Sequence, residues 1–165
     1  MSRLPGVDEL AARLAALPHP ARVAVDGVDA TRKTTLANEL AARLPEAERI
    51  CADDFLRPPV ERYRQGRESP VGYYEDSFDH GRLRSAVLAT TGLAIVDGIF
   101  LQRPELDDLW DFRIFIDIGP DESMRRGVAR DGAETCRASS STWMRCGRRG
   151  APIVVLSRAA AGLRS

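Results

Sequence analysis

The sequence predicts an α/β domain in three layers, with a central parallel sheet covered by helices on both faces. Short apolar runs alternate along the chain with longer amphipathic segments, an order typical of alternating strands and helices. The runs are continuously apolar, as in strands buried on both faces of a parallel sheet. The chain has 165 residues, enough for one domain with a substantial core.

Amphipathic periodicity predicts the helices. The first is expected over 7–17, because Leu10, Leu14 and Leu17 share one face and Pro18 ends it. Further helices are expected over 34–44, 79–89, 104–110 and 120–130. The last of these begins with proline and acidic residues, which suit the first turn of a helix.

Apolar runs bounded by polar residues predict the strands, over 22–26, 48–51, 93–98 and 112–118, and the sequence also allows one over 153–156. Residues 57–76 are polar and rich in proline and glycine, so a long functional loop is expected there.

Charge and cysteine usage narrow the class of protein. The net charge is zero, so nothing points to a nucleic-acid or membrane partner. No apolar run approaches the roughly 18 residues of a membrane span. Three cysteines without metal-ligand spacing fit a reducing cytoplasm, the expected location.

Charge divides the chain unevenly. Residues 135–165 hold six arginines and no acidic residue, whereas the acidic residues all precede them. A folded domain is therefore expected over 1–134, followed by a divergent, arginine-rich and poorly ordered tail over 135–165. A shifted reading frame in the gene is one explanation of this change.

Lys33 is the only lysine of the chain, and it lies where a P-loop has its phosphate-binding lysine. The P-loop pattern is glycine, four residues, glycine, lysine and a hydroxyl residue. Such a loop holds a nucleotide phosphate through backbone N–H groups, and the first hydroxyl after the lysine ligates Mg²⁺. The sequence therefore predicts ATP and Mg²⁺ as cofactors, bound by Gly27, Asp29, Ala30, Thr31, Arg32, Lys33, Thr34 and Thr35. The alternative is an ordinary strand–turn–helix with a solvated lysine.

Acidic residues follow the expected strands. In open parallel sheets, ligands bind at the carboxyl ends of the strands. The acids at such ends are Asp26, Asp53, Asp54 and Asp97.

The chain resembles the uridine kinase family of P-loop nucleoside kinases, in particular its short bacterial members. The likeness runs from about Leu10 to Asp131, and its order and spacing are more specific than any one motif. The segments that carry it are 25–29, 33–37, 53–55, 62–64, 72–74, 76–79, 95–100 and 125–131.

The resemblance implies roles for the strand-end acids in phosphoryl transfer, which needs positioning, charge neutralisation and a proton acceptor. Asp53 would be the base that faces the nucleoside 5′-hydroxyl, and Asp54 would assist substrate or metal-bound water. Asp97 would hold Mg²⁺ through water, together with Thr34. The alternatives are a strand-end acid capping the next turn for Asp53 and a turn aspartate for Asp97.

The resemblance also implies residues for the acceptor and for the lid. Asp79 would bind the ribose hydroxyls, with Phe78 and His80 beside it, and Tyr73 and Tyr74 are candidates for stacking on the base. The tyrosines are equally compatible with anchoring the loop in a small core, and His80 with a local hydrogen bond. Arg126 and Arg130, four residues apart, match the lid arginines that neutralise developing charge; a solvated basic face is the alternative.

Two departures from the family pattern affect the function. Ala30 and Arg32 stand where the family has glycine, and a non-glycine residue at positive φ costs on the order of 1–2 kcal/mol. Arg32 would intrude on the phosphates, swing outward or add a charge to them. The resemblance implies transfer of the ATP γ-phosphate to a nucleoside, with uridine or cytidine as the best match. A related small-molecule kinase, such as one for pantothenate, and a decayed non-catalytic nucleotide-binding protein are the alternatives.

Overall fold

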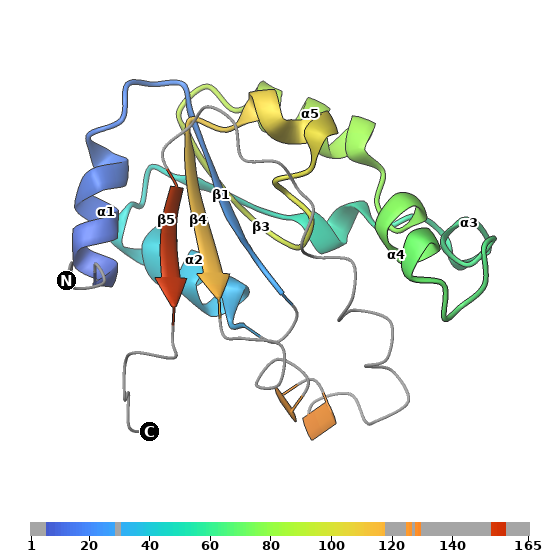
Figure 1. Cartoon of the computed structure of the whole chain (residues 1–165). Coiled ribbons are helices and arrows are strands. Elements are labelled where there is room, and N and C mark those ends of the chain that lie inside the picture. Colours follow the sequence, from blue (N-terminus) through green and yellow to red (C-terminus); the bar gives the residue numbers. More distant parts are fainter. Residues whose placement is uncertain (1–5, 29–30, 118–124, 127, 130–152, 158–165) are drawn as a thin grey trace.

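The core of the molecule is a five-stranded, all-parallel sheet in the order β2-β3-β1-β4-β5 (Figure 1). The computed structural model describes residues 6–28, 31–117, 125–126, 128–129 and 153–157. Its strands are β1 (Ala21–Gly27), β2 (Glu48–Cys51), β3 (Leu93–Asp97), β4 (Phe112–Asp117) and β5 (Ile153–Ser157). The predicted α/β class and parallel sheet are confirmed.

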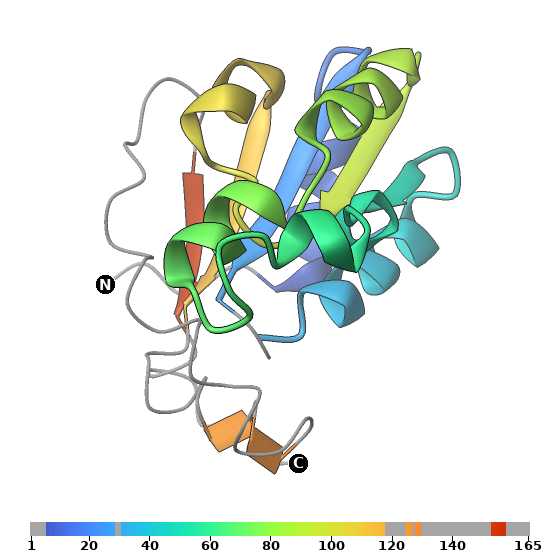
Figure 2. The ribbon, with the colours of Figure 1, turned by 90° about the vertical axis from the view of Figure 1, so that its right-hand side faces the viewer.

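Helices cover both faces of the sheet, as a parallel sheet requires (Figures 1 and 2). Side chains on successive residues of β1 point to opposite faces. Val23 and Val25 pack against α1 (Val7–Ala15) and α2 (Lys33–Arg43), whereas Ala24 packs in the cluster with α5 (His80–Ala89) and the 3₁₀ helix η2 (Pro104–Leu109). The predicted three layers are therefore present.

Local sequence explains where the helices begin. Asp79 caps α5, because its side chain accepts a hydrogen bond from the Arg82 N–H at 2.9 Å. Ser69 caps α4 (Pro70–Asp76) in the same way, accepting from the Gly72 N–H at 3.1 Å. Arg32 precedes α2 without a capping side chain, so the α2 N-terminus keeps backbone N–H groups for other acceptors.

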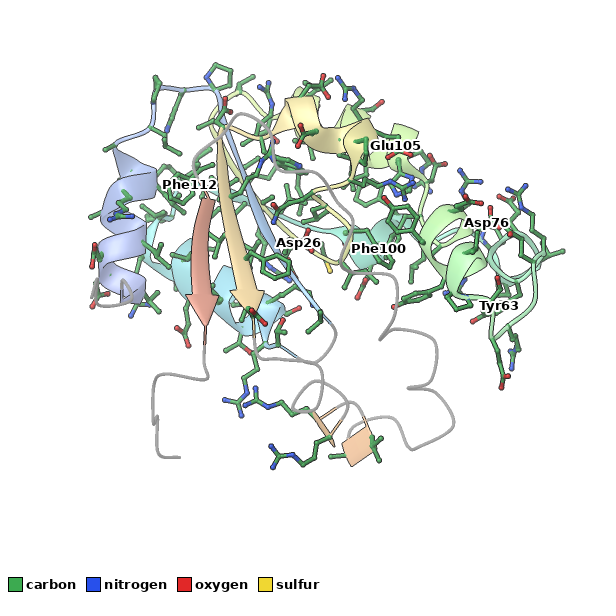
Figure 3. The ribbon with its side chains drawn as sticks, viewed as in Figure 1. Asp26, Tyr63, Asp76, Phe100, Glu105 and Phe112 are labelled. Carbon is green, nitrogen blue, oxygen red and sulfur yellow. The ribbon has the colours of Figure 1, made fainter. Side chains whose placement is uncertain are left out.

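The prediction of a loop over 57–76 is wrong, because this segment contains helices. Two helices lie in it, α3 (Pro59–Arg62) and α4, and Pro59 and Pro70 stand at first-turn positions where proline fits. A tertiary ion pair closes the segment: Arg64 contacts the buried carboxylate of Asp76 at 2.5 Å. This pairing lowers the pKa of Asp76. Asp76 and Tyr63 lie at the far end of the helical layer from β5 (Figure 3).

Smaller differences concern element ends. The first helix ends at Ala15 rather than at residue 17, and residues 104–109 form a 3₁₀ helix. Of the helix expected over 120–130, only residues 125, 126, 128 and 129 are described, and these are helical.

The strand that the sequence allows over 153–156 is present as β5, which pairs in parallel with β4. The rest of 135–165 lies outside the described residues, so the domain boundary at 134 stays a prediction. Within the described parts of the chain, no helix combines the length and apolar character of a membrane span.

Candidate functional site

The loop predicted to bind phosphate spans residues 27–33 and is called the phosphate loop below. It begins at a glycine that the packing requires. Gly27 has a φ of 152°, and a Cβ there would lie 2.6 Å from the Ile116 carbonyl oxygen of β4. That distance is a clash with backbone, so the loop can pass this close to β4 only with glycine. The first position of the predicted motif is thereby explained by local geometry.

Lys33 folds back across this loop from the first turn of α2. Its Nζ donates a hydrogen bond to the Val28 carbonyl at 2.7 Å and lies 3.4 Å from the Thr31 hydroxyl. The ammonium group thus lies over the loop, where backbone N–H groups at the α2 N-terminus also gather. A lysine and a helix N-terminus together fit an anionic phosphate.

Arg32 adopts the left-handed conformation that glycine would normally supply. Its φ and ψ are 64° and 36°, which confirms that position 32 requires a positive φ. A non-glycine residue there costs on the order of 1–2 kcal/mol. The strained backbone is part of the folded structure, so its cost weakens folding.

Arg32→Gly is therefore expected to raise the free energy of unfolding by about 1 kcal/mol, since relief of strain exceeds the extra entropy of the unfolded glycine chain. Urea unfolding would measure it. Arg32→Ala is the matched control, because it removes the guanidinium but keeps the Cβ and hence the strain. Equal stabilities of the Gly and Ala variants would contradict the assignment of strain to the backbone.

Thr34 and Asp97 meet at the carboxyl ends of β1 and β3, as predicted for a Mg²⁺ site. The Thr34 hydroxyl donates to Asp97 Oδ2 at 2.9 Å, across 63 residues of sequence. Hydroxyl and carboxylate oxygens are ligands that Mg²⁺ prefers, so this pair fits the ion when nucleotide phosphates complete its shell. Within the described residues, no three His, Cys, Asp or Glu side chains gather as a further metal site.

Arg49 of β2 is a member of this site that the sequence did not indicate. Its guanidinium contacts Asp97 Oδ1 at 2.8 Å, while the Cys51 thiol lies 4.0 Å from Oδ2. Burial is the main cause that raises the pKa of the half-buried Cys51 thiol. Asp97 thus has a hydrogen bond at Oδ2 and an ion pair at Oδ1.

Asp26, at the end of β1, is a buried acid for which the sequence indicated no specific role. Its carboxylate accepts hydrogen bonds from the Gly27 N–H at 2.7 Å and from the Gln102 N–H at 3.0 Å. Burial raises its pKa from 3.8 to about 6, against the lowering effects of these bonds and of Lys33. An acidic residue directly after the apolar run 23–25 was the available signal.

The raised pKa of Asp26 predicts a pH dependence of stability. Between pH of about 4 and 6 the unfolded chain loses this proton while the folded chain keeps it, so the free energy of unfolding falls as pH rises. The loss is on the order of 3 kcal/mol. Asp26→Asn lacks this titration, so its free energy of unfolding should rise relative to that of wild type over this interval. Urea unfolding at several pH values would measure the difference. A pH-independent difference between the two proteins would contradict the prediction.

Asp53 and Asp54 lie in the 3₁₀ turn η1 (Ala52–Phe55), immediately after β2, and both are exposed. Cys51 pairs in register with Asp97, which brings η1 to the same edge of the sheet as the Thr34–Asp97 pair. The structure thus brings Asp53 and Asp97 to one end of the sheet, as predicted.

The residues predicted for the acceptor lie on α4, α5 and the segment between them. The rings of Tyr73 and Tyr74 meet Phe100 edge-on, with centroids 5.4 Å and 5.0 Å apart. Phe78 is buried, and Asp79 has the capping role described above. The tyrosines therefore anchor α4 to the core, and base stacking stays a prediction.

Arg103 organises the environment of His80. Its guanidinium contacts His80 Nε2 at 3.0 Å and the Tyr74 carbonyl at 2.8 Å, and it binds Glu105 through two bonds of 2.8 Å and 2.9 Å. Burial and the Arg103 charge lower the pKa of His80 to about 4, so this imidazole is neutral at physiological pH. His80 thus contacts a residue 23 positions away in the sequence, whereas the alternative predicted for it was a local hydrogen bond.

The remaining predicted residues are only partly described. Arg126 lies in a helical stretch, whereas Asp29, Ala30 and Arg130 fall outside the described residues. The pairing of the two lid arginines therefore stays a prediction, as do the binding and catalytic roles of the other site residues.

Known proteins resemble this chain in sequence and in fold. No family model matches the chain. Uridine-cytidine kinase B of Dictyostelium discoideum is 29% identical over an alignment of 154 residues, which covers 73% of this chain. This chain spans 62% of the length of that relative.

Two solved structures share the fold. A protein described as a possible uridine kinase from Bacillus stearothermophilus has a TM-score of 0.63 at 20% identity, covering 91% of this chain and 96% of its own. A protein provisionally described as a fructose transport system kinase from Silicibacter sp. TM1040 has a TM-score of 0.65 at 18% identity, covering 92% and 98%. These two structures confirm the predicted P-loop α/β fold. The predicted resemblance to uridine kinases is confirmed in sequence by the Dictyostelium relative.

Proposed function

We propose that this protein transfers the γ-phosphate of ATP to the 5′-hydroxyl of a nucleoside, with Mg²⁺. The observation that carries the proposal is the Thr34–Asp97 hydrogen bond beside Lys33, since it joins the phosphate loop to an acid at the end of β3. These residues supply the positioning and charge neutralisation that phosphoryl transfer needs.

Each group has a defined task under this proposal. Lys33 and the N–H groups of α2 bind the outer phosphates, and Thr34 with Asp97 holds Mg²⁺, which neutralises phosphate charge when bound. Asp53 accepts the proton of the acceptor hydroxyl as that oxygen bonds to phosphorus. Arg126 and Arg130 neutralise charge on the transferred group.

The residues predicted for the acceptor lie on α4, on α5 and between them, and these elements are called the acceptor layer below. They support a nucleoside as the substrate class. Tyr73 and Tyr74 offer aromatic edges and faces beside Phe100, and Asp79 lies at the start of α5, three residues after the end of α4. The neutral His80 adds no charge there. The curated relative is described as a uridine-cytidine kinase, which favours uridine and cytidine first.

A transfer assay tests the proposal directly. Mg-ATP labelled in the γ-phosphate would be offered with uridine, cytidine and adenosine, and with pantothenate and fructose as acceptors of other classes. Label transfer to a pyrimidine nucleoside is expected. Transfer to pantothenate or fructose alone would overturn the nucleoside assignment while keeping the kinase.

Nucleotide binding without catalysis is the second candidate, favoured by the strained Arg32 in the phosphate loop. Calorimetric titration of Mg-ATP separates the two. Binding without transfer to any acceptor would establish this second function, and absence of binding would reject both.

A further inference from the structure

We infer that Asp26 is a positioning residue that links the phosphate loop to the acceptor layer through segment 98–103. The link has two halves. Asp26 joins the end of β1 to Gln102, and residues 100 and 103 of the same segment hold α4 and α5. The consequence for catalysis rests on the function proposed above, whereas the structural link does not.

The first half is a buried carboxylate between two backbone donors. Asp26 is 2% exposed, and its two oxygens accept from different chain segments, Oδ1 from Gly27 and Oδ2 from Gln102. A buried charge is expensive unless strong donors satisfy it, and backbone packing alone needs no acid there. The arrangement fixes the entrance of the phosphate loop relative to segment 98–103.

The second half is the contact of that segment with the acceptor layer. Phe100 lies between Asp26 and α4 in Figure 3, and its ring contacts the rings of Tyr73 and Tyr74 edge-on. Its φ of 60° is a strained conformation that the surroundings must hold. Arg103 binds the Tyr74 carbonyl and stacks on the Tyr74 ring, with its Cζ 4.3 Å from the centroid.

Other contacts make the segment stiff enough to transmit a displacement. Gly98 lies against Ala52, where a Cβ would come within 2.4 Å of the alanine Cβ. The Trp110 indole donates to the Leu101 carbonyl at 2.6 Å. Segment 98–103 therefore moves as a unit, and a change at its Gln102 end reaches Phe100.

Hydrogen–deuterium exchange of Asp26→Asn tests the link without requiring kinase activity. The variant is isosteric, but an amide has one acceptor oxygen, so one of the two N–H donors loses its partner. Exchange is expected to become about tenfold faster in peptides covering 98–103 and 70–76. Peptides from α1 and β4 should be unchanged.

Asp111→Asn is the matched control, because Asp111 accepts the Arg22 N–H at 2.8 Å at the opposite end of β1. This variant should leave 70–76 unchanged. Faster exchange of 98–103 alone in Asp26→Asn, or equal exchange of 70–76 in both variants, would overturn the inference.

A second variant keeps the test decisive if Asp26→Asn does not fold. Phe100→Leu leaves the Asp26 carboxylate in place and removes the ring that α4 contacts. It should accelerate exchange of 70–76 while the peptide over 21–28 stays as in wild type; unchanged exchange of 70–76 would overturn the inference.

Kinetics then connect the link to catalysis. If the proposed transfer is found, Asp26→Asn should raise the acceptor KM about tenfold. The Mg-ATP dissociation constant should change less. A larger loss of ATP affinity than of acceptor affinity would assign Asp26 to the phosphate loop alone.

Discussion

Replacing Lys33 with alanine is expected to weaken Mg-ATP binding by roughly 10- to 150-fold and to abolish turnover. The ammonium group is the lysine charge over the phosphate loop, and a hydrogen bond to a charged group contributes about 1.5–3 kcal/mol, roughly 10- to 150-fold in affinity. Calorimetric titration of Mg-ATP into both proteins would measure the loss.

Arg13→Ala is the control for this experiment. Arg13 is an exposed cation on α1 whose partner is Glu9, four residues earlier. Its removal changes the net charge by the same amount as Lys33→Ala, but at a position away from the loop. It should leave ATP affinity unchanged. The same affinity in Lys33→Ala and wild type would remove the basis for a phosphate site here.

Asp53→Asn is expected to lower kcat by about 10²–10⁴-fold while ATP affinity stays within a few-fold of wild type. A base acts on the acceptor hydroxyl, so its loss affects the transition state more than binding of the phosphate donor. Steady-state kinetics with the best acceptor, together with titration of Mg-ATP, would separate the two effects.

Glu61→Gln provides the comparison, because Glu61 is an exposed acid of α3, 3.9 Å from Arg57. This neutral substitution should leave kcat near the wild-type value. If ATP affinity fell in parallel with kcat in Asp53→Asn, the residue would hold metal or structure instead of accepting the proton.

The sheet was predictable because its signals are local. Apolar runs gave β1 to β4 within one or two residues, and the strand over 48–51 was placed at its observed bounds. The helices α3 and α4 were missed because prolines and glycines in 57–76 look like a loop. What orders them is the Arg64–Asp76 pair, which depends on three-dimensional contact.

The site was predictable to the extent that the motifs are contiguous. Lys33, Thr34 and Asp97 were expected together, and the structure brings them together. Arg49 and Arg103 were missed because their partners lie across strands or between helices. Asp26 was noted as a strand-end acid, but its raised pKa reflects burial that only the folded structure reveals.

The central position of β1 has a consequence for how the chain folds during synthesis. Both neighbours of β1, the strands β3 and β4, lie far downstream, and Asp111, which accepts the Arg22 N–H, follows it by 89 residues. A ribosome-bound chain that has not reached residue 112 would therefore expose an unpaired apolar strand edge, a site for aggregation. Chaperone dependence of the nascent protein should end only once β4 has emerged.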